Sequence, residues 1–278
     1  MQRFRDWLRP NTQLSCLFLP ILTAFFLNYA EIIKDLLLSH NIDIKLLPNG
    51  PILDAFVKFG NIAFVVLISI LILIAFRKSN KDKVLNVGNF HHDHLYIGYY
   101  LCSKILGYRT CSIVRVPIAM QFKLLIRDTF SMFDYGLDTD YRVIEDENVK
   151  VDKPEGVYTN TINIVLSDTY IITEEMLPTT LSNLTTIYIS HENANGAIRY
   201  FSIKFCESIQ ILVRNLPVNV TGINLFSTLN PKHCDWLARN VFKMASRSNI
   251  KSFTVFPQPH KNNEWNFSET GILVYKYR

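Results

Sequence analysis

Residues 56–76 read FVKFGNIAFVVLISILILIAF, and this stretch decides the organisation of the N-terminal part of the chain. Between Phe59 and Phe76 it contains no charged residue, and only Asn61 and Ser69 interrupt it with polar side chains. A helix of this length reaches about 27 Å, close to the thickness of the hydrocarbon core of a bilayer. Helices of soluble domains usually keep a polar stripe along one face. The stretch therefore predicts a membrane span over residues 57–76, with a buried core helix as the alternative.

A second apolar stretch lies upstream, where residues 14–33 read LSCLFLPILTAFFLNYAEII. It contains Pro20, which membrane helices tolerate when neighbouring groups satisfy the freed backbone, and it has Glu31 near its end. Because arginines precede the stretch, a signal peptide is the alternative. However, no small-x-small cleavage site follows. We therefore expect an uncleaved first span over residues 14–33.

Basic residues around the two spans predict their orientation. The flanking ones are Arg3, Arg5, Arg9, Arg77, Lys78, Lys81 and Lys83, and those between the spans are Lys34, Lys45 and Lys58. The positive-inside rule places the more basic flanks in the cytoplasm. We expect a transmembrane hairpin with a basic linker over residues 1–83, with both termini cytoplasmic, followed by a cytoplasmic domain over residues 84–278.

The charge and the cysteines of the chain exclude several classes of function. The net charge is +5, but residues 84–278 carry nearly as many Asp and Glu as Lys and Arg. A domain with so little basic excess is not expected to wrap long nucleic acid, although a small anion needs only a few local donors. The five cysteines form no CxxC pair, and their odd number suits a reducing compartment.

Strand and helix patterns alternate along the second domain. We expect strands at 161–166, 184–189, 220–226 and 252–256, helices at 174–181, 197–215 and 231–246, and a closing edge strand at 271–277. Upstream, we expect strands at 84–87 and 110–116, helices at 94–106 and 120–133, and a loop or short hairpin at 134–160. Such alternation predicts an α/β fold, a Rossmann-like parallel sheet with helices on its faces.

Ligands of open parallel sheets bind beyond the carboxyl ends of the strands, which here are three polar loops. The candidate ligand-binding residues of these loops are Ser167, Thr169, His191, Asn193, Ser227, Thr228, Asn230 and Lys232. In the third loop, Asn230 has the position of an N-cap and Pro231 that of the first helical residue. The helix start, with Lys232, offers donors to a phosphate, and simple helix capping is the alternative.

The histidine cluster NFHHDHLYIG (89–98) suggests a metal site only weakly. Its spacing departs from the His-x-His-x-Asp-His pattern of metallo-β-lactamases. It is more simply a polar loop that caps the next helix through Asp93, and a third possibility is that it lines a nucleotide pocket. The sequence contains no nucleophile elbow, Walker loop or GxGxxG. We therefore expect no metal, no cofactor and no catalytic residues, and hence not an enzyme.

Three segments together resemble a known family. They are NIVLSDTYIITEEML (163–177), LTTIYISHENANGAIRYFSIKFCESI (184–209) and GINLFSTLNPKHCDWLARNVFKMA (222–245). Their order of apolar strands, polar loops and apolar helices is similar to the C-terminal half of the SAVED domain, a fusion of two CARF-like Rossmann units that senses cyclic oligonucleotides. Two features depart from that family: the expected first unit is short, and VFPQP (255–259) replaces a tyrosine-rich strand end.

Two spans followed by a SAVED-like domain resemble the membrane effectors of bacterial CBASS antiphage defence. The resemblance implies a multi-pass protein of the inner membrane whose ligand is a cyclic oligonucleotide. It further implies that ligand binding drives homo-oligomerisation and that the spans then disrupt the lipid bilayer. The alternatives are a membrane-tethered hydrolase or transferase, and a non-catalytic membrane docking protein.

Overall fold

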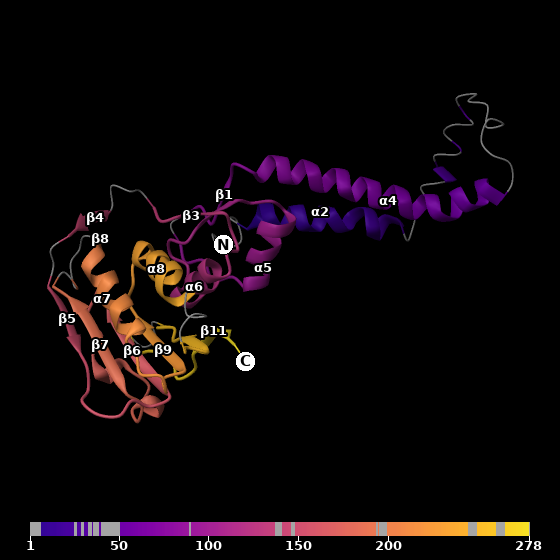
Figure 1. The fold of residues 1–278 in the computed structure, drawn as a ribbon. Coiled ribbons are helices and arrows are strands. Elements are labelled where there is room, and N and C mark those ends of the chain that lie inside the picture. The colour runs from indigo at the N-terminus through magenta and orange to yellow at the C-terminus, as the bar shows by residue number, and fades with distance from the viewer. Residues whose placement is uncertain are drawn as a thin grey trace. The chain divides into compact units, whose positions relative to one another are not determined.

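The computed structural model describes residues 7–24, 27–28, 31–32, 35, 39, 51–88, 90–136, 141–145, 148–192, 194, 199–243, 249–259 and 265–277 (Figure 1). The chain divides into two units. The first unit is Met1–Gly88 with Gly98–Arg109, and the second is Asn89–Ile97 with Thr110–Arg278.

The first unit contains two long helices that lie side by side, α2 (Leu8–Ala24) and α4 (Pro51–Asn80) (Figure 1). Within the described residues, Phe59–Asn80 is long and apolar enough to cross a membrane, and only 6% of its apolar 18-residue window is buried. The expected span over 57–76 falls within α4. The expected first span over 14–33 overlaps α2, although part of it lies outside the described residues.

A polar cluster joins the ends of these two helices. The helix α4 continues beyond the expected span, through the basic residues Arg77 and Lys78 to Asn80. The side chain of Asn80 is fully buried and exchanges hydrogen bonds with Gln13, donating at 2.9 Å and accepting at 3.2 Å. Asn80 also donates to the carbonyl of Leu106 at 3.0 Å. These bonds satisfy the buried amide of Asn80 and connect the last turn of α4 to α2 and to Leu106.

The chain then forms β1 (Val84–Leu85), α5 (Tyr96–Tyr100) and a π-helix (Leu101–Ile105). In the first unit, the indole of Trp7 donates to Asn86 at 3.1 Å and meets the ring of Tyr99 edge-on at 5.4 Å.

The second unit is built on a six-stranded sheet. Its strands are β5 (Val149–Asp152), β6 (Thr161–Ser167), β7 (Thr186–His191), β9 (Gly222–Ser227), β10 (Ser252–Val255) and β11 (Ile272–Lys276). Their order is β11-β10-β9-β6-β7-β5. The four inner strands are parallel, while β11 and β5 pair antiparallel at the edges. This confirms the predicted parallel sheet and its closing edge strand.

Helices cover one face of this sheet. They are α6 (Ile118–Ile126), α7 (Ile203–Arg214) and α8 (Pro231–Leu237), which continues as a π-helix (Ala238–Phe242). Phe242 stacks on Phe253 at 4.2 Å between ring centres, and Phe122 meets both rings edge-on. Such aromatic pairs add to the free energy of burying the rings, so this cluster anchors the helices to the sheet.

Shorter elements cover the other face. Two 3-10 helices, Glu174–Met176 and Thr179–Leu181, replace the expected helix over 174–181, because Pro178 has no N–H to continue one. Phe226 of β9 stacks on Phe256 at 4.6 Å beneath this cover. Because successive side chains of a strand point to opposite faces of the sheet, neighbouring residues such as Leu225 and Phe226 pack under different helices.

Two expected helices are shorter than predicted. The helix over 197–215 begins only at Ile203, because Ser202 caps it by accepting from the N–H of Phe205 at 3.1 Å. The preceding residues form β8 (Arg199–Ser202), parallel to β4 (Tyr141–Ile144). The helix over 120–133 ends at Ile126, and β3 (Met132–Asp134) then pairs with β2 (Thr110–Ser112).

Candidate functional site

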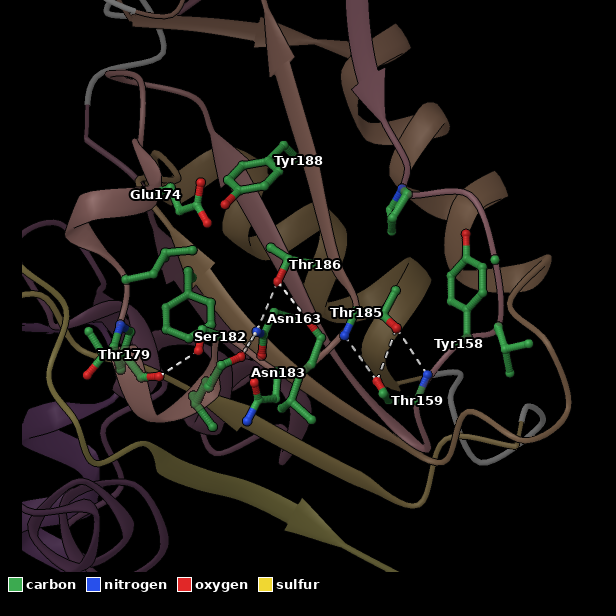
Figure 2. A pocket seen from close by; sticks show the side chains of 18 of the residues that line it. Tyr158, Thr159, Asn163, Glu174, Thr179, Ser182, Asn183, Thr185, Thr186 and Tyr188 are labelled. Atoms are coloured by element: carbon green, nitrogen blue, oxygen red, sulfur yellow. Dashed lines mark hydrogen bonds between the residues drawn. The ribbon is translucent and has the colours of Figure 1, made fainter.

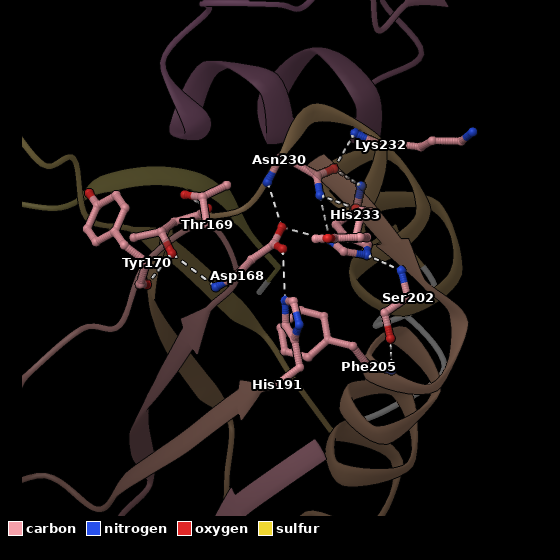
Figure 3. A network of polar contacts seen from close by, with 11 residues as sticks. Asp168, Thr169, Tyr170, His191, Ser202, Phe205, Asn230, Lys232 and His233 are labelled. Carbon is pink, nitrogen blue, oxygen red and sulfur yellow. Dashed lines mark hydrogen bonds and ion pairs between the residues drawn. The ribbon is translucent and has the colours of Figure 1, made fainter. Parts of the chain in front are cut away.

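Asp168, the first residue after β6, forms the centre of a buried polar network at the carboxyl ends of the strands (Figure 3). One carboxylate oxygen accepts from Nε2 of His191 at 3.0 Å. The other accepts from Nδ1 of His233 at 2.7 Å and from the backbone N–H of Asn230 at 2.8 Å. One carboxylate therefore joins the end of β6 to the end of β7 and to the start of α8.

The hydrogen bonds of His233 define its tautomer. The backbone N–H of Ser202 donates to Nε2 of His233 at 2.8 Å, so this nitrogen carries no proton. The proton that His233 donates to Asp168 is therefore on Nδ1. Through Ser202, the network also reaches the residue that caps α7.

The network keeps Asp168 ionised. Burial alone would raise the pKa of this carboxyl group, because a charged group loses its hydration. The electrostatic attraction of the His233 N–H group and the hydrogen bonds from His191, His233 and the Asn230 amide outweigh burial and lower the pKa to about 2. A buried carboxylate with this many donors stabilises the loops that provide them.

The predicted capping of α8 is confirmed. The side-chain oxygen of Asn230 accepts from the backbone N–H groups of Lys232 and His233, both at 3.0 Å, and Pro231 is the first helical residue. The side-chain amide of Asn230 donates to the carbonyl of Tyr200 at 2.8 Å. The N–H groups that could bind a phosphate are therefore used by the cap.

The other predicted residues have different environments. Ser167 accepts from the N–H of Ile172 at 3.0 Å. Thr228 accepts from the N–H of Asp168 at 3.0 Å, and the exposed Thr169 donates to the carbonyl of Thr228 at 2.8 Å. The buried hydroxyl of Ser227 has no hydrogen-bond partner among the described residues.

The side chain of Lys232 does not join this cluster. The ammonium of Lys232 lies 5.5 Å from the ring centres of both Tyr141 and Phe201, and in Figure 3 its side chain points away from the network. Asn193 lies outside the described residues. The structure therefore brings Ser167, Thr169, His191, Thr228 and Asn230 together.

Sequence reasoning missed two members of the network, Asp168 as its centre and His233 as a partner. The available signals were weak. An Asp that directly follows an apolar strand is also a common loop residue, and a His two residues after Pro231 is distant in sequence from both Asp168 and His191.

A cavity of about 560 Å³ lies against the face of the sheet that the two 3-10 helices cover (Figure 2). Residues 154–159 and 177–186 form most of its wall, and Asn163, Tyr188 and Phe226 of the sheet also line it. No sequence pattern predicted it, because its wall comes from segments without regular periodicity.

The histidine cluster shows no metal site within the described residues, where no group of three or more potential ligands converges. His92 is fully buried, and its ring centre lies 4.5 Å from that of Phe90. The ring therefore packs within the fold.

Comparison with known proteins adds two findings. A model of the SMODS- and Ubiquitin system-associated 2TM effector domain matches residues 3–270. No curated protein sequence matches the chain.

Among solved structures, an Acinetobacter baumannii Cap4 SAVED/CARF-domain containing receptor is similar in its complexes with two cyclic trinucleotides. The complex with 3′3′3′-cAAA gives 9% identity and a TM-score of 0.41, and that with 2′3′3′-cAAA gives 10% and 0.42. The alignments cover 64% of this chain and 42% and 41% of the receptor chains, so the chain spans less than half of their length. Because the family model covers nearly all of the sequence, the chain belongs to the family of SMODS- and ubiquitin system-associated 2TM effector domains.

Proposed function

We propose that this protein is a membrane effector of antiphage defence. Its second unit binds a cyclic oligonucleotide, ligand binding drives homo-oligomerisation, and the apolar helices then disrupt the bacterial inner membrane. The match of residues 3–270 to a 2TM effector family carries this proposal. The exposed apolar surface of Phe59–Asn80 supports it, since such a surface is stable in a bilayer and costly in water.

The second unit is proposed to act as a sensor rather than an enzyme. Its histidine–carboxylate network resembles part of a catalytic triad, but Asp168, His191 and His233 are at most 5% exposed. Burial also raises the pKa of the Cys206 and Cys234 thiols, so neither is a ready nucleophile. A substrate therefore has no access to the groups that would carry out chemistry.

We place the ligand at the carboxyl ends of the strands, above the Asp168 network. Thr169 is exposed and Lys232 is half-buried there, so these two residues are proposed to contact the ligand. The buried candidates Ser167, His191, Ser227, Thr228 and Asn230 would hold the loops, and Asn193 would complete the second loop. In this arrangement the network positions the loops instead of touching the phosphates.

Calorimetry of the full chain in detergent against cyclic di-, tri- and tetranucleotides tests the proposal. We expect at least one of them to bind and to cause dye leakage from liposomes at the same concentration. Binding without leakage would favour a docking protein. Turnover of a cyclic nucleotide would favour the tethered enzyme instead.

Lys232→Glu tests the ligand site. The substitution places a negative charge near the phosphates and removes the cation that packs on Tyr141 and Phe201. Affinity for the cyclic oligonucleotide should fall at least tenfold while the unit stays folded, as measured by circular dichroism. Lys204→Glu on the exposed side of α7 is the matched control. Equal affinities of the two variants would remove Lys232 from the site.

The basic flanks support cytoplasmic placement of both termini. Protease added outside intact spheroplasts should therefore spare residues 84–278, and digestion of this region from outside would reverse the proposed topology.

A further inference from the structure

The cavity of about 560 Å³ is lined by side chains that the proposed ligand site does not use (Figure 2). Its sheet-facing part contains Asn163 of β6 and Thr186 of β7, which lie opposite each other in the register of the two strands. Asn224 of β9 donates to Asn163 at 3.1 Å, and Asn163 donates to the hydroxyl of Thr186 at 3.1 Å. The second N–H of Asn163 goes to the carbonyl of Leu181 at 3.0 Å. This ladder is satisfied within the protein.

Among the polar groups on the wall that remain available to a ligand, two lie next to each other. The side chains of Glu174 and Tyr188 form no hydrogen bond with any described residue, and Figure 2 shows the carboxylate and the phenol hydroxyl directed toward one another. Burial raises the pKa of Tyr188, and the nearby carboxylates of Glu174 and Asp152 raise it further. The hydroxyl therefore stays protonated and can donate, next to a carboxylate that can only accept.

The charge of the cavity excludes a phosphate. Glu155 and Glu174 contribute two carboxylates, and the described residues that line the cavity include no Lys, Arg or His. A phosphate in this cavity would meet like charges and no cation, which is electrostatically unfavourable. The ligand group that fits is therefore uncharged and offers hydrogen-bond donors to a carboxylate.

Apolar surface completes the chemistry of the site. Leu177 and Tyr188 line the cavity and are both half-buried, so a flat ring can pack on the exposed part of an aliphatic and an aromatic side chain. The volume falls within the range of small-molecule pockets.

We propose that this cavity binds an amino-bearing nucleobase, such as adenine or cytosine, of the nucleotide ligand. Glu174 accepts from the exocyclic amino group, and the Tyr188 hydroxyl donates to the adjacent ring nitrogen. Uracil fits less well, because two carbonyl oxygens that the carboxylate repels flank its ring N–H. The inference rests on the proposed function for the identity of the whole ligand, and it assigns base selection to a site away from the carboxyl ends of the strands.

Titration calorimetry of the full chain in detergent with adenosine, cytidine, uridine and inorganic phosphate tests this site. We expect adenosine or cytidine to bind at least tenfold more tightly than uridine, and phosphate not to compete. Glu174→Gln keeps the shape but removes the charge, so affinity for the amino-bearing nucleoside should fall at least tenfold. Glu175→Gln, a neighbour that is exposed and does not line the cavity, should bind like the natural protein.

Several outcomes would overturn the inference. These are equal binding of uridine, competition by phosphate, or the same affinity in the Glu174→Gln and Glu175→Gln variants with unchanged melting temperatures. If the natural protein binds a cyclic oligonucleotide but Glu174→Gln leaves that affinity unchanged, the base site is wrong and the proposed function stands. If amino-bearing nucleosides bind but no cyclic oligonucleotide does, the base site stands and the proposed function is wrong.

Discussion

Asp168 holds together the loops on which the proposed ligand site depends. Replacing it with Asn keeps the size of the side chain but removes the charge. One carboxylate oxygen is then replaced by an NH2 group, which faces an N–H donor of the network instead of accepting from it. Hydrogen bonds to a charged group are worth about 1.5–3 kcal/mol each, so the Asp168→Asn variant should lose about 3 kcal/mol of its free energy of unfolding. Urea denaturation of the detergent-solubilised protein measures this loss.

The same variant should change the response to acid. The pKa of Asp168 is about 2 in the folded protein against 3.8 ordinarily, so the unfolded chain takes up the proton first as the pH falls. The stabilisation is therefore complete above about pH 4 and is lost as the pH falls to about 2, a change of roughly 2 kcal/mol. Asp168→Asn should remove this part of the pH dependence. Asp152→Asn, at an exposed position of β5, is the control. If both variants keep the slope of the natural protein, Asp168 does not produce it.

This network also shows where sequence reasoning about single residues ends. The loops themselves could be predicted, because each follows an apolar strand of a parallel sheet. Which side chains meet could not be predicted, since Asp168 and His233 are 65 residues apart and their contact depends on the order of the strands. The sequence also could not distinguish a polar group that faces a ligand from one that satisfies a neighbouring loop.

Among the elements, the connection between α2 and α4 gives the clearest prediction. Asn80→Leu leaves the buried amide of Gln13 and the carbonyl of Leu106 without their partner, and an unsatisfied buried polar group costs about 1–3 kcal/mol. The melting temperature of the helical hairpin in detergent should fall by several degrees. Ser79→Ala removes an exposed hydroxyl that accepts from Arg9, and it should have little effect. Equal melting temperatures for both variants would mean that the cluster does not hold the helices together.

The elements that sequence predicted well are those with a clear periodicity. The inner strands β6 and β9 are mostly apolar and buried along their length, β7 and β10 alternate between buried and half-buried residues, and the long apolar helix α4 has no polar stripe. Errors occurred where local hydrogen bonds compete with periodicity. Arg199–Ser202 continues the apolar spacing of α7, yet pairing with β4 and the Ser202 cap make it a strand.

At the scale of the whole molecule, the proposed activity depends on how ligand binding would reach the membrane. Two spans cannot line a wide pore, because the wall of a pore needs several helices and no unpaired backbone can face lipid. Disruption of a membrane therefore requires several chains. A ligand favours the assembled state only by binding it more tightly than the monomer. We therefore expect ligand-dependent growth in particle size at the concentration that causes dye leakage.

Charges introduced on α4 test whether the proposed ligand binding can be separated from the proposed membrane disruption. Leu67 and Leu71 are 54% and 56% exposed, so substituting them disturbs little packing. A lysine near the centre of a span costs about 2.5–3.5 kcal/mol, so the Leu67→Lys/Leu71→Lys variant should insert poorly. Ligand binding and particle growth in detergent should persist, while dye leakage from liposomes falls to background. Leu67→Phe/Leu71→Phe, which keeps the surface apolar, should leak like the natural protein. Leakage by the lysine variant at the natural level would show that α4 does not act in the bilayer, and loss of ligand binding in that variant would show that the two units do not fold independently.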